Sequence, residues 1–194
     1  MDDAKFCITQ KVNFIGFVFY EKSPRNISIN DASLILDEID KKIKTVAVTK
    51  DPSNDLLNSL ASLKFEYIQV HGNISIDRLT EIKSITNKKI IMAFNVSSES
   101  DLEKIENYEN LSEFLLFDSA SPGSGKQFDW SLINNVVTKK DFFLSGGLNS
   151  ENLLSAINSV KTNYFDISSG VEKISGVKDI TKISEVVNII NSKH

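Results

Sequence analysis

Short apolar runs recur along the chain at nearly regular intervals, and Gly, Asp, Asn or Ser bounds them. They are rich in Phe, Ile and Val, which is typical of strands that are buried on both faces of a parallel sheet. The pattern therefore predicts strands over residues 14–19, 46–49, 67–70, 90–94, 114–117, 142–145 and 164–168.

Between these runs lie segments whose apolar residues recur at helical spacing. Ser28 and Asn149 stand where an N-cap belongs, because their side-chain oxygens can accept a hydrogen bond from a backbone N–H of the first turn. The clearest predicted helices cover residues 28–42, 149–160 and 179–190.

The strict alternation of strand and helix indicates right-handed β-α units and a parallel sheet. We count seven strands and about eight helices, and the first predicted element is a helix. An eight-fold β/α barrel begins with a strand, so we expect a single domain over residues 1–194 that forms such a barrel without its first strand. A doubly wound open sheet is the alternative, but no Gly-rich turn follows the first predicted strand.

Composition limits the classes of partner. The net charge of −4 argues against nucleic acid or an anionic membrane as a main partner. No apolar run approaches the roughly 18 residues of a membrane-spanning helix. The one cysteine cannot form an internal disulfide, which fits a reducing cytoplasm. His71 and His194 are the only histidines, and the sequence shows no cluster of metal ligands.

The functional residues of a β/α barrel follow the carboxyl ends of its strands, and six of the eight glycines lie in such loops or just behind them. The loops "SGG" at 145–147 and "SSG" at 168–170 follow the last two predicted strands, where barrels commonly bind phosphate. Glycine lets backbone N–H groups approach an oxyanion closely. The alternative is that both loops are merely tight turns.

Three other strand-end residues are candidates for chemistry. Asp118 directly follows "FLLF"; half-sheltered from water it could act as a general acid, or it could only cap a turn. Arg25 could hold a carboxylate through two parallel hydrogen bonds, or be a solvated loop residue. His71 could be catalytic, or hydrogen-bond to backbone. The "GSGK" fragment is not a nucleotide-binding loop, because Gln127 replaces the required Ser or Thr.

Taken in order, five stretches resemble the phosphoribosylanthranilate isomerase family: "GFVFYEKSPRNIS", "IQVHG", "LLFDSASPGSGKQFDW", "LSGGLNSENLLSAI" and "FDISSGVE". The resemblance runs from about Asp3 to the C-terminus. It implies an Amadori rearrangement of N-(5-phosphoribosyl)anthranilate in tryptophan biosynthesis. It also implies a small-molecule substrate, no cofactor or metal, and a monomer or homodimer.

The resemblance also implies roles for particular residues. Asp118 matches the family's general acid, and Arg25 matches the arginine that faces the anthranilate carboxylate. The residues that match the phosphate-binding loops are Gly146, Gly147, Ser169 and Gly170. The residues that match a mobile cover over the site are Gly123, Ser124, Gly125 and Lys126.

The family's general base is a cysteine in a first-strand motif of the form K-I-C-G, and this motif is absent from the 194 residues. The resemblance aligns Cys7 with the middle of the first helix, where we expect a small buried residue rather than the base. A late start of the chain is the explanation we favour. A natural truncation with loss of activity, or Asp166 as a substitute base, are the alternatives. The 194-residue chain should then have low activity and exposed sheet edges that can associate.

Two other functions fit the same loops. One is a protein that binds a sugar phosphate without turning it over. The other is a different phosphate-binding barrel enzyme such as indole-glycerol-phosphate synthase. That enzyme needs catalytic lysines at strand ends, whereas these positions here carry Arg25, Gln69, His71 and Asp118.

Overall fold

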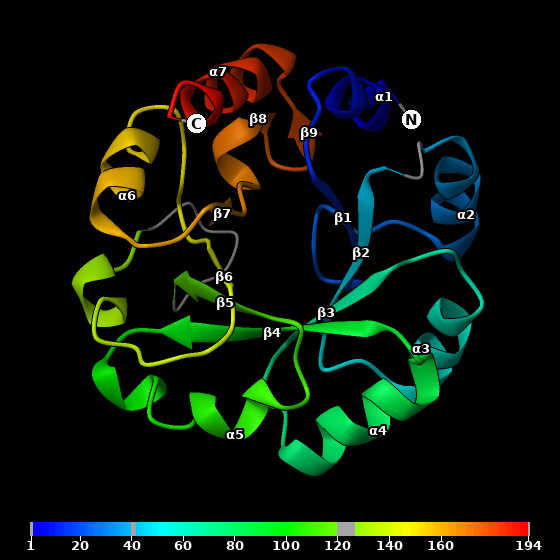
Figure 1. Ribbon diagram of the computed structural model, residues 1–194. Helices are drawn as coiled ribbons and strands as arrows, with labels where there is room; N and C mark the ends of the chain where they lie inside the picture. Colours follow the sequence, from blue (N-terminus) through cyan, green and yellow to red (C-terminus); the bar gives the residue numbers. More distant parts are fainter. Residues whose placement is uncertain (1, 40–41, 120–126, 194) are drawn as a thin grey trace. The chain divides into compact units, whose positions relative to one another are not determined.

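The computed structural model describes residues 2–39, 42–119 and 127–193. The chain forms two compact units, Met1–Met92 and Ala93–His194, and each is described by itself. The first contains α1 (Asp2–Thr9), β1 (Phe14–Phe19), α2 (Ile29–Glu38), β2 (Lys44–Lys50), α3 (Asn54–Ala61), β3 (Tyr67–His71) and α4 (Ile76–Thr86) (Figure 1). Strand β4 (Lys89–Val96) begins in the first unit and ends in the second.

The second unit is less regular. It contains the 3-10 helix η1 (Glu99–Asp101), then α5 (Ile105–Glu109), β5 (Phe114–Ser119), the 3-10 helix η2 (Trp130–Ile133) and β6 (Phe142–Leu144). After these come α6 (Leu153–Ser159), β7 (Tyr164–Phe165), the 3-10 helix η3 (Ser169–Val171), β8 (Glu172–Ile174), β9 (Val177–Lys178) and α7 (Ile180–Asn191).

Strands β1 to β7 lie in one sheet in the order of the sequence, which confirms seven predicted strands. The last of them was predicted over residues 164–168, whereas β7 covers only Tyr164–Phe165. The strand pairs whose register is defined are all parallel: β1–β2, β2–β3, β3–β4, β5–β6 and β6–β7. Strands β8 and β9 form a separate antiparallel hairpin, which the sequence did not predict.

Serine begins each of the helices α2, α3 and α4 in the same way. The hydroxyl oxygens of Ser28, Ser53 and Ser75 accept hydrogen bonds from the backbone N–H three residues later. Each cap satisfies one of the N–H groups that a helix start leaves without an internal partner. The predicted cap at Ser28 is thereby confirmed.

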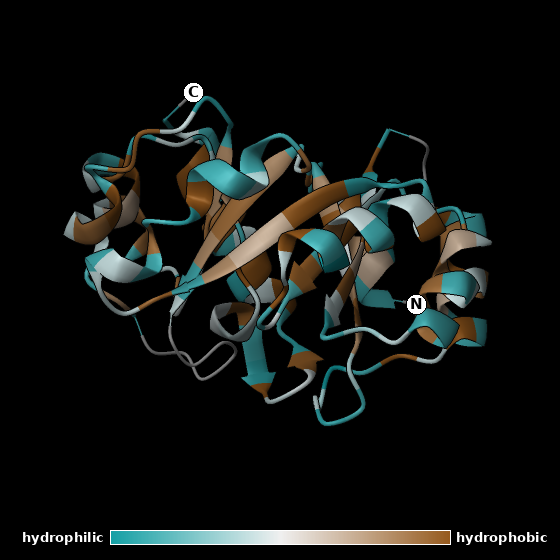
Figure 2. Cartoon of the chain, turned by 90° about the horizontal axis from the view of Figure 1, so that it is seen from below, coloured by the Kyte–Doolittle hydropathy of each residue, from teal (hydrophilic) through white to brown (hydrophobic). Residues whose placement is uncertain are grey.

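The core of the first unit lies between its strands and the helices that cover one of their faces (Figure 1). Ile68 of β3, Leu57 and Leu60 of α3 and Leu79 of α4 are completely buried. Phe65 contacts the ring of Phe17 edge-on, with 5.4 Å between the centroids. In Figure 2 the helices show hydrophobic and hydrophilic residues in alternation, as amphipathic helices do.

In the second unit, Leu115 of β5 and Leu144 of β6 are completely buried with Leu153 and Ala156 of α6. Phe114, Phe143 and Tyr164 form a cluster of rings, with centroid distances of 5.1 to 5.3 Å. This cluster joins the first residues of β5 and β7 to the middle of β6, and the site lies at the carboxyl ends of these strands.

The structure corrects three predictions about helices. Seven α-helices occur in the described residues rather than about eight. Between β5 and β6 the described residues form only the 3-10 helix η2, and the next residues, Asn134 to Thr138, have low helix propensity. Helix α6 begins after Asn152, not Asn149. Cys7 was expected to be buried but is half-buried, and α1 has no buried residue.

Candidate active site

Asp118 is the next-to-last residue of β5 and is 6% exposed. Its Oδ1 accepts a hydrogen bond from the Ser119 N–H at 2.8 Å. Burial and, to a lesser degree, the negative charge of Asp166 raise the pKa of Asp118 to about 7, against the opposite effect of the Ser119 N–H. Near neutral pH this carboxyl group can therefore both donate and accept a proton.

Backbone pairing beyond the last strand residues brings the neighbouring chain ends to the same edge. The Ser145 N–H donates to the carbonyl oxygen of Phe117 at 2.8 Å, and the Asp166 N–H donates to that of Leu144 at 2.9 Å. Ser145 and Asp166 thus continue the register of β5, β6 and β7. In this register Ser145 lies beside Asp118, and Asp166 lies beside Ser145 on the next strand. The charge of Asp166 is therefore near enough to affect the pKa of Asp118.

The first glycine loop packs directly against Asp118. Gly146 has a φ of +89°, and a Cβ atom there would lie 2.7 Å from the Ser119 nitrogen and 3.2 Å from Asp118 Oδ1. Gly147 also has a positive φ, of 69°. A side chain at Gly146 would push against the acid itself, so the position requires glycine for both space and backbone conformation.

The second glycine loop touches the first. A Cβ atom on Gly170 would lie 1.9 Å from the carbonyl oxygen of Leu148, so only glycine permits this approach of two backbones. Within the described residues, no hydrogen bond uses the backbone N–H groups of Gly146, Gly147, Ser169 or Gly170. Unpaired N–H groups in touching loops are what a phosphate or another oxyanion binds.

Two asparagines hold the first glycine loop in place. Asn149 Oδ1 accepts from the N–H groups of Glu151 and Asn152, and the Asn149 N–H donates back to Asn152 Oδ1 at 2.9 Å. The Asn152 amide also donates to the carbonyl oxygen of Gly147 at 3.0 Å. Asn149 was predicted as a cap and Asn152 was not; the Asn-x-x-Asn spacing was the available signal.

Arg25 lies in the first unit, in the loop between β1 and α2, and is half-buried. The backbone N–H of Arg25 donates to Ser23 Oγ at 3.1 Å. Asn26 Oδ1 accepts from the backbone N–H of Tyr20 at 2.9 Å and so joins the loop to the end of β1. The loop that presents Arg25 is thus held at both ends by its own side chains.

His71 is the last residue of β3, also in the first unit. Its Nε2 lies 2.8 Å from Nε2 of Gln69, an amide nitrogen that can only donate, so the ring nitrogen accepts. Burial and the positive charge of Lys50 lower the pKa of His71 to about 4, which fits a neutral ring. The next residue, Gly72, has a φ of +113°, and a Cβ atom there would lie 2.0 Å from Asp51 Oδ1.

Other predicted features lie elsewhere. Gly123, Ser124, Gly125 and Lys126 are outside the described residues. Cys7 is in the middle of α1 rather than at the end of a described strand. No group of three or more His, Cys, Asp or Glu side chains in the described ranges could hold a metal ion. None of the described helices is long and apolar enough to cross a membrane.

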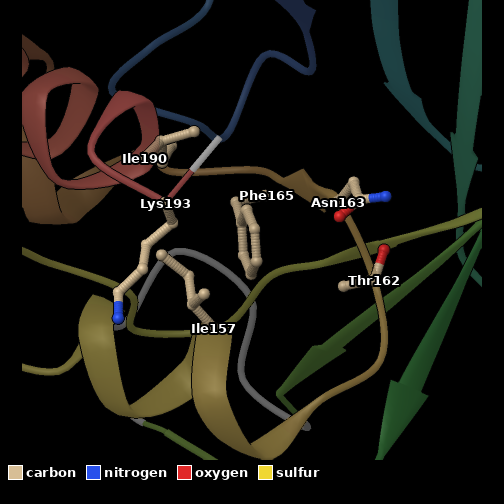
Figure 3. Close-up of a pocket in the computed structure, with 6 residues that line it drawn as sticks. All are labelled: Ile157, Thr162, Asn163, Phe165, Ile190 and Lys193. Atoms are coloured by element: carbon tan, nitrogen blue, oxygen red, sulfur yellow. The ribbon is translucent and has the colours of Figure 1, made fainter.

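A pocket of ≈ 190 Å³ lies at the opposite, amino end of β7 (Figure 3). The Phe165 ring stands in its middle, and Thr162 and Asn163 just before the strand line one side. The remaining lining residues are Ile157, Ile190 and Lys193. The pocket includes none of the residues around Asp118.

The chain is similar in sequence to N-(5'-phosphoribosyl)anthranilate isomerases. Residues 1–189 match the family model described as N-(5'phosphoribosyl)anthranilate (PRA) isomerase. The N-(5'-phosphoribosyl)anthranilate isomerase of Rhizobium rhizogenes is 38% identical over 184 residues, which are 91% of this chain and 83% of that protein. The enzyme of the same name from a Caulobacter species is 37% identical, over 98% of this chain and 93% of that protein.

Solved structures of phosphoribosyl anthranilate isomerases have the same fold as this chain. Phosphoribosyl anthranilate isomerase from Thermotoga maritima superposes with a TM-score of 0.88 at 33% identity, over 98% of this chain and 94% of that chain. A phosphoribosyl anthranilate isomerase in complex with reduced 1-(o-carboxyphenylamino)-1-deoxyribulose 5-phosphate gives a TM-score of 0.85 at 33% identity, over 98% and 93% of the two chains.

Proposed function

Because this chain belongs to the phosphoribosylanthranilate isomerase family, we propose that it converts N-(5'-phosphoribosyl)anthranilate to 1-(2-carboxyphenylamino)-1-deoxyribulose 5-phosphate in tryptophan biosynthesis. The observation that carries the proposal is the buried carboxyl group of Asp118, with a pKa of about 7, packed against a glycine loop. A general acid works best when its pKa lies near the pH at which it acts.

Asp118 is the general acid of this reaction. It protonates the ribose ring oxygen as the C1–O bond breaks and the nitrogen lone pair forms a C1=N bond. A base then removes the proton from C2, and its electron pair forms a C1=C2 bond and neutralises the nitrogen. The resulting enol becomes the ketone of the product. The negative charge of Asp166 and the burial of Asp118 keep the proton on the acid until the ring oxygen takes it.

The two glycine loops bind the substrate phosphate. Support comes from the contact between Gly170 and the Leu148 carbonyl, and from the unused N–H groups of Gly146, Gly147, Ser169 and Gly170 in the described structure. These loops follow the last two strands of the sheet, which is where β/α barrels commonly bind phosphate.

Arg25 binds the anthranilate carboxylate. A guanidinium group matches a carboxylate through two parallel hydrogen bonds, and this gives orientation as well as affinity. The bonds of Ser23 and Asn26 hold the loop in a fixed form, so little conformational freedom is lost when the substrate binds.

A strand with the family's K-I-C-G motif, joined ahead of α1, would supply the base that removes the C2 proton. Support comes from the strand order, in which β1 and β7 are the end strands of the described sheet. Such a strand would pair with a sheet edge and bring its cysteine to the carboxyl ends. Asp166 is the alternative base, because its charge already acts on Asp118.

Assembly as a homodimer belongs to the same proposal. Its support is the Thermotoga maritima relative, whose structure is described as that of monomers made from a dimeric phosphoribosylanthranilate isomerase, at 33% identity to this chain.

The test is conversion of N-(5'-phosphoribosyl)anthranilate, followed through the optical signal of its anthranilate group. The chain joined to a K-I-C-G strand ahead of Asp3 should form the product, and Asp118→Asn in this extended chain should lower the rate by about 10²–10⁴-fold, as expected for loss of general acid catalysis. If the extended chain binds reduced 1-(o-carboxyphenylamino)-1-deoxyribulose 5-phosphate without any conversion, the result would instead indicate a protein that binds a sugar phosphate.

A further inference from the structure

Glu172 and Lys178 form an ion pair behind the second glycine loop. Lys178 Nζ lies 3.1 Å from Glu172 Oε1, and the Glu172 side chain is only 4% exposed. The two residues face each other across the β8–β9 hairpin. Lys178 is 27% exposed, and an ion pair with one buried partner gains little net stability, because the buried charge loses its water. The pair therefore calls for a second role.

That role follows from a second bond of the lysine. Lys178 Nζ also donates to the carbonyl oxygen of Ser168 at 2.9 Å. In a planar trans peptide the carbonyl of one residue and the N–H of the next point in opposite directions. The Ser169 N–H is thus turned away from Lys178, and no hydrogen bond in the described residues uses it.

The lysine cannot shift freely, because Glu172 is itself fixed on several sides. Glu172 Oε2 accepts from the Gly176 N–H at 3.2 Å, and the Glu172 carbonyl oxygen accepts from Lys182 Nζ of α7 at 2.8 Å. The Asp179 N–H donates to the carbonyl oxygen of Val171 at 2.8 Å, which joins the start of α7 to the end of η3.

We propose that Glu172 and Lys178 are positioning residues for the substrate phosphate. Lys178 orients the Ser168–Ser169 peptide so that the Ser169 N–H faces the phosphate, and Glu172 holds Lys178 in place. This inference rests on the proposed function, since it takes the second glycine loop as the phosphate site. Neither residue touches the substrate.

Lys178→Met removes the charge and the hydrogen bond to Ser168 but keeps most of the apolar stem. Binding of inorganic phosphate and of reduced 1-(o-carboxyphenylamino)-1-deoxyribulose 5-phosphate is measured by NMR titration of the ¹⁵N-labelled chain, well below its melting temperature. We expect the Kd for both to rise roughly tenfold, the loss of about one well-aligned hydrogen bond. The Ser169 amide signal should also shift before any phosphate is added.

Lys89→Met is the matched control. Lys89 pairs with Glu66 at 3.2 Å in the first unit and is half-exposed, so this variant loses an ion pair that is not part of the β8–β9 hairpin. Its phosphate affinity should equal that of the unchanged chain. Lys178→Arg should restore most of the affinity, because a guanidinium can still donate to both Glu172 and Ser168. Glu172→Gln should weaken binding by a few-fold, since it removes only the charge that holds Lys178.

Unchanged phosphate affinity in Lys178→Met, with binding by the unchanged chain, overturns the positioning role and leaves the proposed function standing. Absence of phosphate binding in the unchanged chain overturns both. If Lys178→Met does not fold, Glu172→Gln decides: an unchanged Kd and an unshifted Ser169 signal contradict the proposal.

Discussion

A single carboxyl group at the end of β5 combines deep burial with a titration near neutral pH. Asp118 is 6% exposed, and its pKa is raised to about 7 by burial and by Asp166. Its position could be predicted from the sequence, because an acidic residue directly after a buried strand must lie at the carboxyl edge. Its pKa could not, since Asp166 lies far away in the sequence and reaches Asp118 only through the pairing of β5, β6 and β7.

Asp118 should make the stability of the chain depend on pH. Its pKa rises from about 3.8 in the unfolded chain to about 7 in the folded one, so the folded state holds the extra proton between these values. The free energy of unfolding should therefore fall as the pH rises from roughly 4 to roughly 7, by at most about 1.4 kcal/mol per pH unit. Urea unfolding across this range, compared with Asp118→Asn, measures the effect.

The Asp118→Asn variant carries no titrating group at this position, so the difference in stability between the two proteins should grow with pH in favour of the variant. Parallel curves for the two proteins would show that Asp118 keeps an ordinary pKa in the folded chain.

At the scale of elements, serine caps begin the helices α2, α3 and α4 of the first unit. Ser75 Oγ accepts from the Arg78 N–H at 3.1 Å at the start of α4. Ser75→Ala should lower the free energy of unfolding by about 1 kcal/mol, because one N–H of the first turn loses its partner. Ser84→Ala, at an exposed position inside the same helix, is the control and should be neutral or slightly stabilising. Equal effects of the two changes in urea unfolding would contradict the role of the cap.

The elements also show which parts of the fold a sequence pattern reveals. The apolar runs predicted all seven strands of the sheet, because burial on both faces leaves a continuous signal. The β8–β9 hairpin has strands of three and two residues, too short for any periodicity. The bond from Lys178 to Ser168 spans ten residues and depends on that hairpin, so no local pattern could predict it. The glycine loops of the site were predicted, whereas the hairpin behind them was not.

At the scale of the whole molecule, the strand order gives the described sheet two end strands, β1 and β7. End strands carry N–H and C=O groups that another strand can pair with. A strand of the family's K-I-C-G type, joined to Asp3 by a short loop, would supply both a partner for such an edge and a thiol that can act as the base. The proposed mechanism depends on a base at the carboxyl end of this strand.

The most direct test compares the rate of conversion of N-(5'-phosphoribosyl)anthranilate by the 194-residue chain and by the same chain extended with this strand. The extended chain should be about 10²–10⁴-fold faster, as expected for the gain of a general base, and changing the added cysteine to alanine should remove the gain without loss of stability. A 194-residue chain that is as fast as the extended one would contradict this account and assign the base to a residue already present, with Asp166 the first to replace.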